Sequence, residues 1–153
     1  MYKRQVYQYT IKNTDGNLAS NLLNTIYKAK NSTYYIGTNK GIVFMDKDKK
    51  SFKTYNISDG ISNNAIMDIQ ENNEGIWFSS LNGLTCYRFK DKLFYNFYEK
   101  DGLPHNEFNQ HSSFKDNNGI IYFGGLNGGI KFKGNNFNFS IPNTTLRPVS
   151  IEY

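Results

Sequence analysis

Residues 59–84 read DGISNNAIMDIQENNEGIWFSSLNGL, and this stretch decides the fold because related versions of it occur three times along the chain. The copies begin at Asp15-Gly16, Asp59-Gly60 and Asp101-Gly102, a spacing of about 42 residues. Each copy continues with a short apolar strand, a polar turn and a second strand that contains an aromatic residue. A fixed period of this length is the signature of a repeat architecture.

Three kinds of position recur in every copy. An asparagine precedes the first strand, an aromatic residue lies in the second strand, and a glycine closes the turn after it. The asparagines are Asn21, Asn64 and Asn106; the aromatic residues are Tyr35, Trp77 and Tyr122; the glycines are Gly41, Gly83 and Gly128. Two of these turns contain Asn-Gly, which is a strong hairpin signal. One departure is Gly129, which stands where the other copies have Ile42 or Leu84.

Each unit contains about four short strands and no helical periodicity, which is the size and strand count of a β-propeller blade. The sequence therefore predicts an all-β fold with about three four-stranded antiparallel blades over residues 1–141. We expect the blades at about 15–58, 59–100 and 101–141. Residues 5–10 resemble an orphan fourth strand of a preceding blade, and 142–153 resemble an exit strand or linker. Known propellers have about four to eight blades, so we expect a fragment of a larger propeller or one completed by oligomerisation.

Composition and charge exclude several classes of protein. The 153 residues carry a formal net charge of +5, but the lysines are scattered and arginines are few, so we expect solvated loops and no nucleic-acid partner. The single cysteine, Cys86, excludes an internal disulfide and a cysteine-based zinc site. No apolar run is long enough for a membrane helix, so we expect no membrane contact by this segment. The first residues do not form a signal peptide, and an export signal of a parent protein would lie outside this chain.

The repeated positions have a structural and a functional interpretation. Asparagines at Asn21, Asn64 and Asn106 could hydrogen-bond a ligand, but side chains repeated in every blade are better explained as caps of the local backbone. The same reasoning makes Gly41, Gly83 and Gly128 turn residues. Trp77 could stack on a sugar ring, but packing between blades buries aromatic area in every repeat and is the favoured interpretation.

The third repeat departs from the others along its first strand, Phe108-Asn109-Gln110-His111-Ser112-Ser113. Innermost strands line the channel of a propeller, so polar side chains there could bind a ligand or water. His105 precedes this strand, and we predict His105, Asn109 and His111 as the ligand-binding residues. The alternative is that His111 is an interior histidine whose ring nitrogens are paired within the fold.

Catalytic chemistry has little support in the sequence. Two histidines with Glu107 or Asp116 could be imagined as metal ligands, but their spacing matches no recognised site. The two serines after His111 lack the context of an activated nucleophile. We therefore predict no catalytic residue, no metal and no cofactor.

The runs Asp59–Ile66 and Gly75–Leu84 resemble the two-component regulator propeller repeat. The runs Gly102–Asn109 and Ile121–Gly128 resemble the last blade of such sensors, and the tail from Pro142 to Tyr153 resembles the passage into a following immunoglobulin-like domain. The resemblance covers about residues 5–153.

The resemblance implies a ligand-sensing segment on the periplasmic, extracytoplasmic face of a membrane-anchored hybrid two-component histidine kinase. In that family the ligand is often an oligosaccharide, and the signal passes through the immunoglobulin-like domain and a membrane helix to the kinase and its phosphorelay. The implied partners are the remaining blades, the immunoglobulin-like domain and possible further copies of the chain. Two alternatives stay open: a propeller enzyme of the streptogramin-lyase type and a general protein-interaction propeller.

Overall fold

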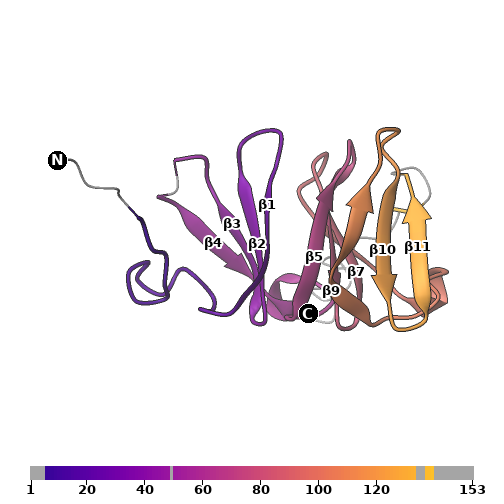
Figure 1. The fold of residues 1–153 in the computed structure, drawn as a ribbon, viewed down its shortest axis with the longest axis horizontal. Helices are drawn as coiled ribbons and strands as arrows, with labels where there is room; N and C mark the ends of the chain where they lie inside the picture. Colours follow the sequence, from indigo (N-terminus) through magenta and orange to yellow (C-terminus); the bar gives the residue numbers. More distant parts are fainter. Residues whose placement is uncertain (1–5, 49, 134–136, 140–153) are drawn as a thin grey trace, which may run out of the picture.

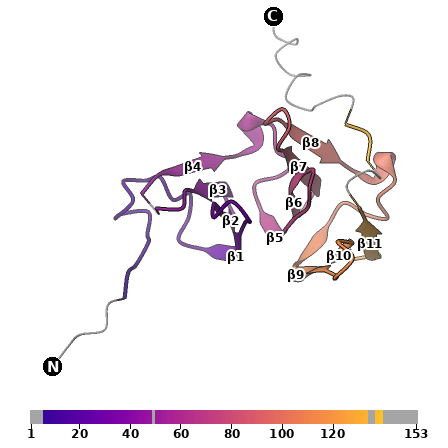
Figure 2. The same ribbon diagram turned by 90° about the horizontal axis from the view of Figure 1, so that it is seen from above.

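The protein is an all-β molecule whose sheets stand side by side like blades. The structure, a computed structural model, describes residues 6–48, 50–133 and 137–139. It contains two four-stranded sheets and one three-stranded sheet, and no α-helix within those residues. The predicted all-β class with propeller-like blades is confirmed. Figure 1 shows the sheets in a row, and Figure 2 shows them from above as an arc.

Each sheet is a meander of neighbouring antiparallel strands and falls inside one sequence repeat. The first contains β1 (Leu23–Lys28), β2 (Tyr34–Thr38), β3 (Gly41–Met45) and β4 (Phe52–Tyr55). The second contains β5 (Ile66–Glu71), β6 (Gly75–Ser80), β7 (Gly83–Arg88) and β8 (Phe94–Phe97). The third contains β9 (Phe108–Lys115), β10 (Ile121–Gly125) and β11 (Gly128–Phe132). Strands β1, β5 and β9 lie on the inner side of the arc (Figure 2).

The Asp-Gly pairs at the starts of the second and third repeats form the connections between sheets. Short 3-10 turns, η1 (Ile57–Asp59) and η2 (Glu99–Asp101), each end at a glycine in the left-handed region, with φ of 111° at Gly60 and 110° at Gly102. The aspartate carboxylates accept the backbone N–H three residues earlier, at 2.9 Å in both turns. The chain therefore leaves one sheet and enters the next with the same local geometry.

The hydrophobic core lies between the sheets. Residues from facing sheets form two large clusters, one between the first and second sheets and one between the second and third. A third cluster, built around Leu18, Ile36 and Val43, covers the outer face of the first sheet with the N-terminal segment. The stability of the array therefore comes from contacts between neighbouring blades, as in other repeat proteins.

The described residues contain eleven strands, and two predicted strands, the orphan strand and the fourth strand of the third blade, are not among them. Residues 6–10 form no strand. Phe137 and Phe139 also lie outside any strand, and their rings instead pack against Trp77 and Phe97. Residues 1–5 and the expected exit strand at 142–153 lie outside the described residues.

Candidate functional site

The repeated asparagines make the same bond in every blade. The side-chain oxygen of Asn21 accepts the backbone N–H of Ile11 at 2.8 Å. The equivalent oxygens of Asn64 and Asn106 accept N–H groups at 2.8 Å and 2.7 Å, from Ile57 and Glu99. Each asparagine therefore caps the turn that leads into its own blade, which is a structural role.

The backbone of these asparagines also links neighbouring blades. Gly41 donates its N–H to the Asn64 carbonyl at 2.7 Å, and Gly83 donates to the Asn106 carbonyl at 2.6 Å. A side chain at Gly41 would place its Cβ 2.3 Å from the Tyr55 carbonyl oxygen, so glycine is required there. Gly128 holds the equivalent position in the third sheet.

Trp77 lies in the packed interface between the second and third sheets. Its side chain has 0% exposure, and its ring contacts Phe97, Phe132 and Phe137 with centroids 4.6–5.9 Å apart. The indole Nε1–H donates to Asn72 Oδ1 at 2.8 Å. This ring is covered on all sides, so it cannot stack on a ligand without the blades separating.

His105 is buried, at 6% exposure. Its ring makes the hydrogen bond that a hydroxyl group makes in the other blades. Thr38 and Ser80 donate their hydroxyls to the carbonyls of Gly41 and Gly83. The third repeat has Gly125 at the position of Thr38 and Ser80, and there the His105 Nε2 lies 3.1 Å from the Gly128 carbonyl. A carbonyl can only accept, so Nε2 is the donor, and Nδ1 is left buried without a partner.

Asn109 and His111 are exposed on β9, away from the environment of His105. His111 has a φ of 53°, an uncommon backbone conformation for a residue other than glycine. The interior histidine that the sequence suggested at His111 is therefore found at His105 instead. The structure does not join the three residues into one site, because the His105 ring is enclosed and hydrogen-bonded within the fold.

The inner strands are connected by amide side chains that the sequence analysis did not single out. Gln110 Nε2 on β9 donates to Asn24 Oδ1 on β1 at 2.7 Å. Gln70 Nε2 on β5 donates to Ser113 Oγ on β9 at 2.8 Å. The signal for these bonds in the sequence is a glutamine in the first strand of both the second and the third repeat. These bonds hold the inner edge of the arc together and position Asn109 and His111 beside them.

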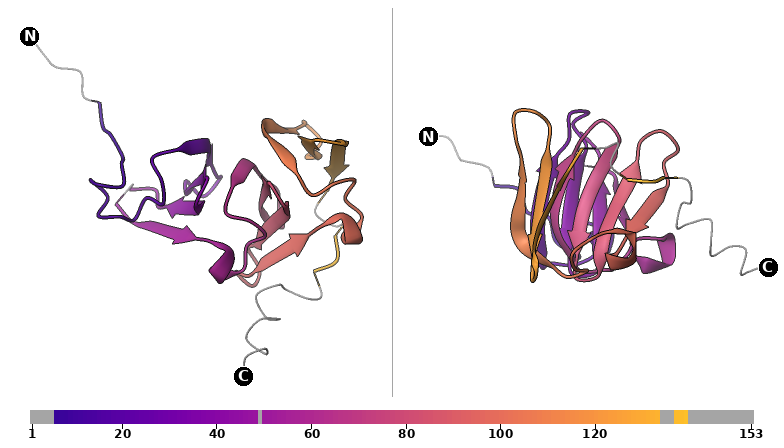
Figure 3. Two further views of the ribbon diagram at one scale, coloured as in Figure 1. Left: turned by 90° about the horizontal axis from the view of Figure 1, so that it is seen from below. Right: turned by 90° about the vertical axis from the view of Figure 1, so that its right-hand side faces the viewer.

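A groove of about 550 Å³ lies on the third sheet and includes His111. Within β10, Ile121 and Phe123 pack toward the second sheet, so Tyr122 between them points to the opposite, outer face. Phe114 and Tyr122 contribute two rings, with centroids 6.3 Å apart. We call this the outer groove; its lining includes His111, Ser112, Phe114, Tyr122, Gly124 and Lys131. Figure 3 shows this sheet at the end of the array.

Metal and nucleophile chemistry find no support among the residues that the structure describes. Those residues contain no group of three or more His, Cys, Asp or Glu that could hold a metal ion. Cys86 is buried, and burial raises the pKa of its thiol, so the thiolate that would react is disfavoured. No helix in the described ranges has the length and hydrophobicity to cross a bilayer.

Comparison with known proteins identifies extracellular domains of bacterial signalling systems as structural neighbours. The extracellular domain of the hybrid two-component system BT3049 from B. thetaiotaomicron superposes with a TM-score of 0.72 at 30% identity, covering 76% of this chain and 16% of that one. The extracellular domain of BT4673 from the same organism superposes with a TM-score of 0.64 at 20% identity, covering 79% of this chain and 18% of that one, and shares the fold. No family model matches the sequence.

A curated relative is a histidine kinase. "Histidine kinase P4" of Formosa agariphila is 33% identical over 94 residues, which cover 58% of this chain and 7% of the kinase. The chain therefore spans a small part of each protein that it matches. The structural neighbours bear out the resemblance to extracytoplasmic regions of two-component systems. Because the matched regions are extracellular domains, they also support the prediction that this segment is not the catalytic part of an enzyme.

Proposed function

We propose that this chain is a ligand-sensing segment of the extracytoplasmic propeller of a hybrid two-component histidine kinase. Its parent is anchored in the membrane, and this segment lies on the periplasmic side. The match to the extracellular domain of BT3049 carries the proposal, because it combines 30% identity with the same arrangement of blades over 76% of the chain. In this role the segment binds a ligand, and the parent passes the signal to a phosphorelay and to transcription.

The ligand that we propose is an oligosaccharide, bound at the outer groove with Asn109 beside it. Sugar rings have apolar faces and a rim of hydroxyls, and they need aromatic rings together with a few polar groups. Phe114 and Tyr122 supply the rings, while His111 and Ser112 supply polar groups. His105 contributes indirectly by holding the β10–β11 turn through its bond to Gly128.

The open ends of the array support a further blade as partner. At one end, Gly128 holds the position from which Gly41 and Gly83 donate to the next blade. A blade docked there would lie against the face that carries the outer groove, so the ligand would bind at the junction of the two blades. At the other end, Asn21 holds the position from which Asn64 and Asn106 accept. The blade comes from the parent chain or from a second copy, and two copies would make a six-bladed ring. Light scattering distinguishes these sources, since a monomer excludes the second copy. An immunoglobulin-like domain after residue 142 completes the proposed architecture.

A ligand screen and the flanking reading frame test the function. We expect neutral oligosaccharides to raise the thermal unfolding temperature of the chain, and His111→Ala to abolish that shift without changing the far-ultraviolet circular dichroism. A downstream membrane helix and kinase motifs are expected in the full gene. Absence of the kinase motifs would refute the parent assignment, and absence of any shift would refute sugar sensing by this segment.

A further inference from the structure

A pocket of about 400 Å³ lies between the first and second sheets, apart from the outer groove on the third. Both sheets contribute to its walls, since Tyr35 and Phe44 belong to β2 and β3, and Tyr87 belongs to β7. Four of the lining side chains are aromatic, and the others include an amide and an ammonium group. We call it the aromatic pocket; its lining includes Asn31, Tyr35, Phe44, Tyr87, Phe89 and Lys92.

The rings of the aromatic pocket hold one another in place. Phe44 packs edge-on against Tyr35 and Tyr87, with ring centroids 4.7 Å and 4.9 Å apart. Tyr35 is buried, whereas Phe44, Tyr87 and Phe89 are half-buried. These half-buried rings line the pocket, so they can contact the ring of a ligand without any separation of the two sheets.

The equivalent space between the second and third sheets is filled by a ring of the protein itself. In that interface the strand registers place Trp77 where the first interface has Tyr35, and Phe132 where it has Tyr87. The Phe137 ring packs against both residues, with centroids 5.1 Å from Trp77 and 4.8 Å from Phe132. One phenyl ring therefore fits between these two aligned positions.

In the first interface, the residue at the position of Phe137 is Lys92. Phe137 follows Phe132 by five residues, and Lys92 follows the aligned Tyr87 by five residues. The lysine side chain lines the space but brings no ring to fill it, and the aromatic pocket is present there. The filled interface thus indicates which group suits the open one: a planar aromatic ring.

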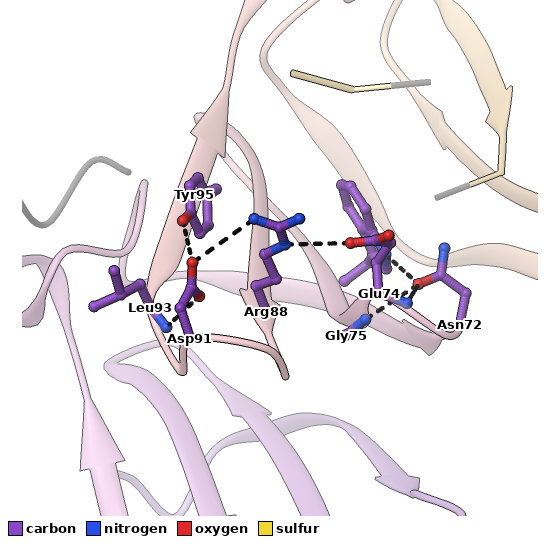
Figure 4. A network of polar contacts seen from close by, with 8 residues as sticks. Asn72, Glu74, Gly75, Arg88, Asp91, Leu93 and Tyr95 are labelled. Atoms are coloured by element: carbon purple, nitrogen blue, oxygen red, sulfur yellow. Dashed lines mark hydrogen bonds and ion pairs between the residues drawn. The ribbon is translucent and has the colours of Figure 1, made fainter. Parts of the chain in front are cut away.

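Lys92 brings a positive charge to the pocket, while the carboxylates of the same blade are engaged elsewhere. Asp91 accepts the hydroxyl of Tyr95, a residue of the cluster between the second and third sheets. Arg88 pairs with Asp91 at 3.7 Å and with Glu74 at 3.2 Å, and Figure 4 shows the three side chains in a line. Neither carboxylate therefore neutralises Lys92, and the pocket attracts an anionic group.

The tyrosines of the pocket are hydrogen-bond donors at neutral pH. Burial, and then the nearby Tyr87 and Glu71, raise the pKa of Tyr35 to about 12, and burial raises the pKa of Tyr87 above its usual value. Both hydroxyls therefore keep their protons. Because Glu71 acts on Tyr35, a negative charge lies near that end of the pocket, and an anionic group is favoured at the Lys92 end.

We propose that the aromatic pocket binds a small planar aromatic carboxylate. The ring of the ligand takes the place that Phe137 takes in the next interface, and its carboxylate pairs with Lys92. The volume accommodates one or two rings. Because both sheets line the pocket, the bound ligand stabilises the contact between the first two blades. The site uses no residue of the outer groove, so it goes beyond the proposed sensing function and does not depend on it.

Isothermal titration calorimetry on the full chain tests the proposal. The probes are benzoate with its neutral counterpart benzamide, and 2-naphthoate with 2-naphthamide. We expect at least one carboxylate to bind, and its amide to bind about tenfold more weakly or not at all. Lys92→Gln should weaken binding of the carboxylate about tenfold, the effect of one charge-assisted hydrogen bond. Lys90→Gln removes the same charge from an exposed position of the same turn, outside the lining, and should change nothing.

A second variant tests the comparison between the two interfaces. Lys92→Phe places a ring where the third repeat has Phe137, so it should fill the pocket and abolish binding of both carboxylates. Nuclear magnetic resonance of the labelled chain locates the site without any substitution. Backbone amide shifts on addition of the carboxylate that binds should centre on residues 31–35 and 87–92.

Several outcomes would overturn the proposal. They are the absence of binding by either carboxylate, equal binding of carboxylate and amide, equal effects of Lys92→Gln and Lys90→Gln, and amide shifts centred on the outer groove. His111→Ala, a variant of the outer groove, should leave carboxylate binding unchanged. Failure of the aromatic pocket is therefore separable from failure of the proposed sugar site.

Discussion

Two equivalent faces of the array carry very different residues. On the second sheet, the face toward the third sheet presents Trp77, Leu84 and Cys86, all at 0% exposure. On the third sheet, the aligned outer face presents Tyr122, Gly129 and Lys131, which are half-buried or exposed. The repeat builds the same sheet in both places. The residues on each face instead reflect its surroundings. The face of the second sheet packs against a neighbouring sheet, and the face of the third sheet carries the outer groove.

Alanine substitutions at Trp77 and Tyr122 test this contrast, and they should show the largest difference in stability. Trp77→Ala removes a fully buried ring and should lower the free energy of unfolding by about 3–5 kcal/mol. Tyr122→Ala at the aligned position should cost about 1 kcal/mol or less, as at other partly exposed sites. Urea denaturation followed by circular dichroism measures both. Equal losses would mean that the outer face is packed as tightly as the inner one.

Substitutions at Gly125 and His105 test how the third blade replaces the hydroxyl group that Thr38 and Ser80 supply in the other blades. A Cβ at Gly125 would lie 2.1 Å from His105 Cε1, so Gly125→Ala should destabilise the fold by about 1–3 kcal/mol. Part of that loss should disappear in the His105→Ala background, because the clashing ring is gone. A double-mutant cycle in urea measures the coupling. Strictly additive losses would show that the ring and the glycine are not coupled.

Substitutions of Asn106 test the capping role of the repeated asparagines. Asn106→Ala removes the acceptor of the Glu99 N–H and should cost about 1 kcal/mol. Asn106→Asp keeps an acceptor oxygen and serves as the matched control, with a smaller loss expected. Both are measured by thermal and chemical denaturation. A larger loss for the aspartate variant would contradict a capping role for this side chain.

The smallest effect on stability at neutral pH is expected for Tyr35, which lies in the interface between the first and second sheets. Burial, and then the nearby Tyr87 and Glu71, raise its pKa to about 12. The unfolded chain ionises at a lower pH, so the neutral hydroxyl stabilises the folded state below about pH 10, and this contribution is lost as the pH rises to about 12. Urea midpoints across that range should fall, and less steeply for Tyr35→Phe. If the urea midpoints of the unmodified chain and of Tyr35→Phe fall in parallel as the pH rises, Tyr35 does not contribute to the loss of stability.

The role of His105 shows where prediction from the sequence stopped. The repeat alignment marks Gly125 as different from Thr38 and Ser80, and it marks His105 as different from Asn63. Nothing in the alignment says that one change compensates the other, because that depends on the position of a ring in three dimensions. The same limit applies to the prediction of one site from His105 and His111: the two residues are close in sequence, but one faces the interior and the other solvent.

The blades follow from the sequence alone, because turn residues and the strand pattern act over a few residues and recur in register. The Asp-Gly turns, the capping asparagines and the closing glycines are local devices of this kind. Which faces are packed, how His105 is used and which amide side chains of the inner strands meet all depend on the tertiary structure. Asn24 and Gln110 belong to the first and third repeats, and only the stacking of the blades brings their side chains within 2.7 Å of each other.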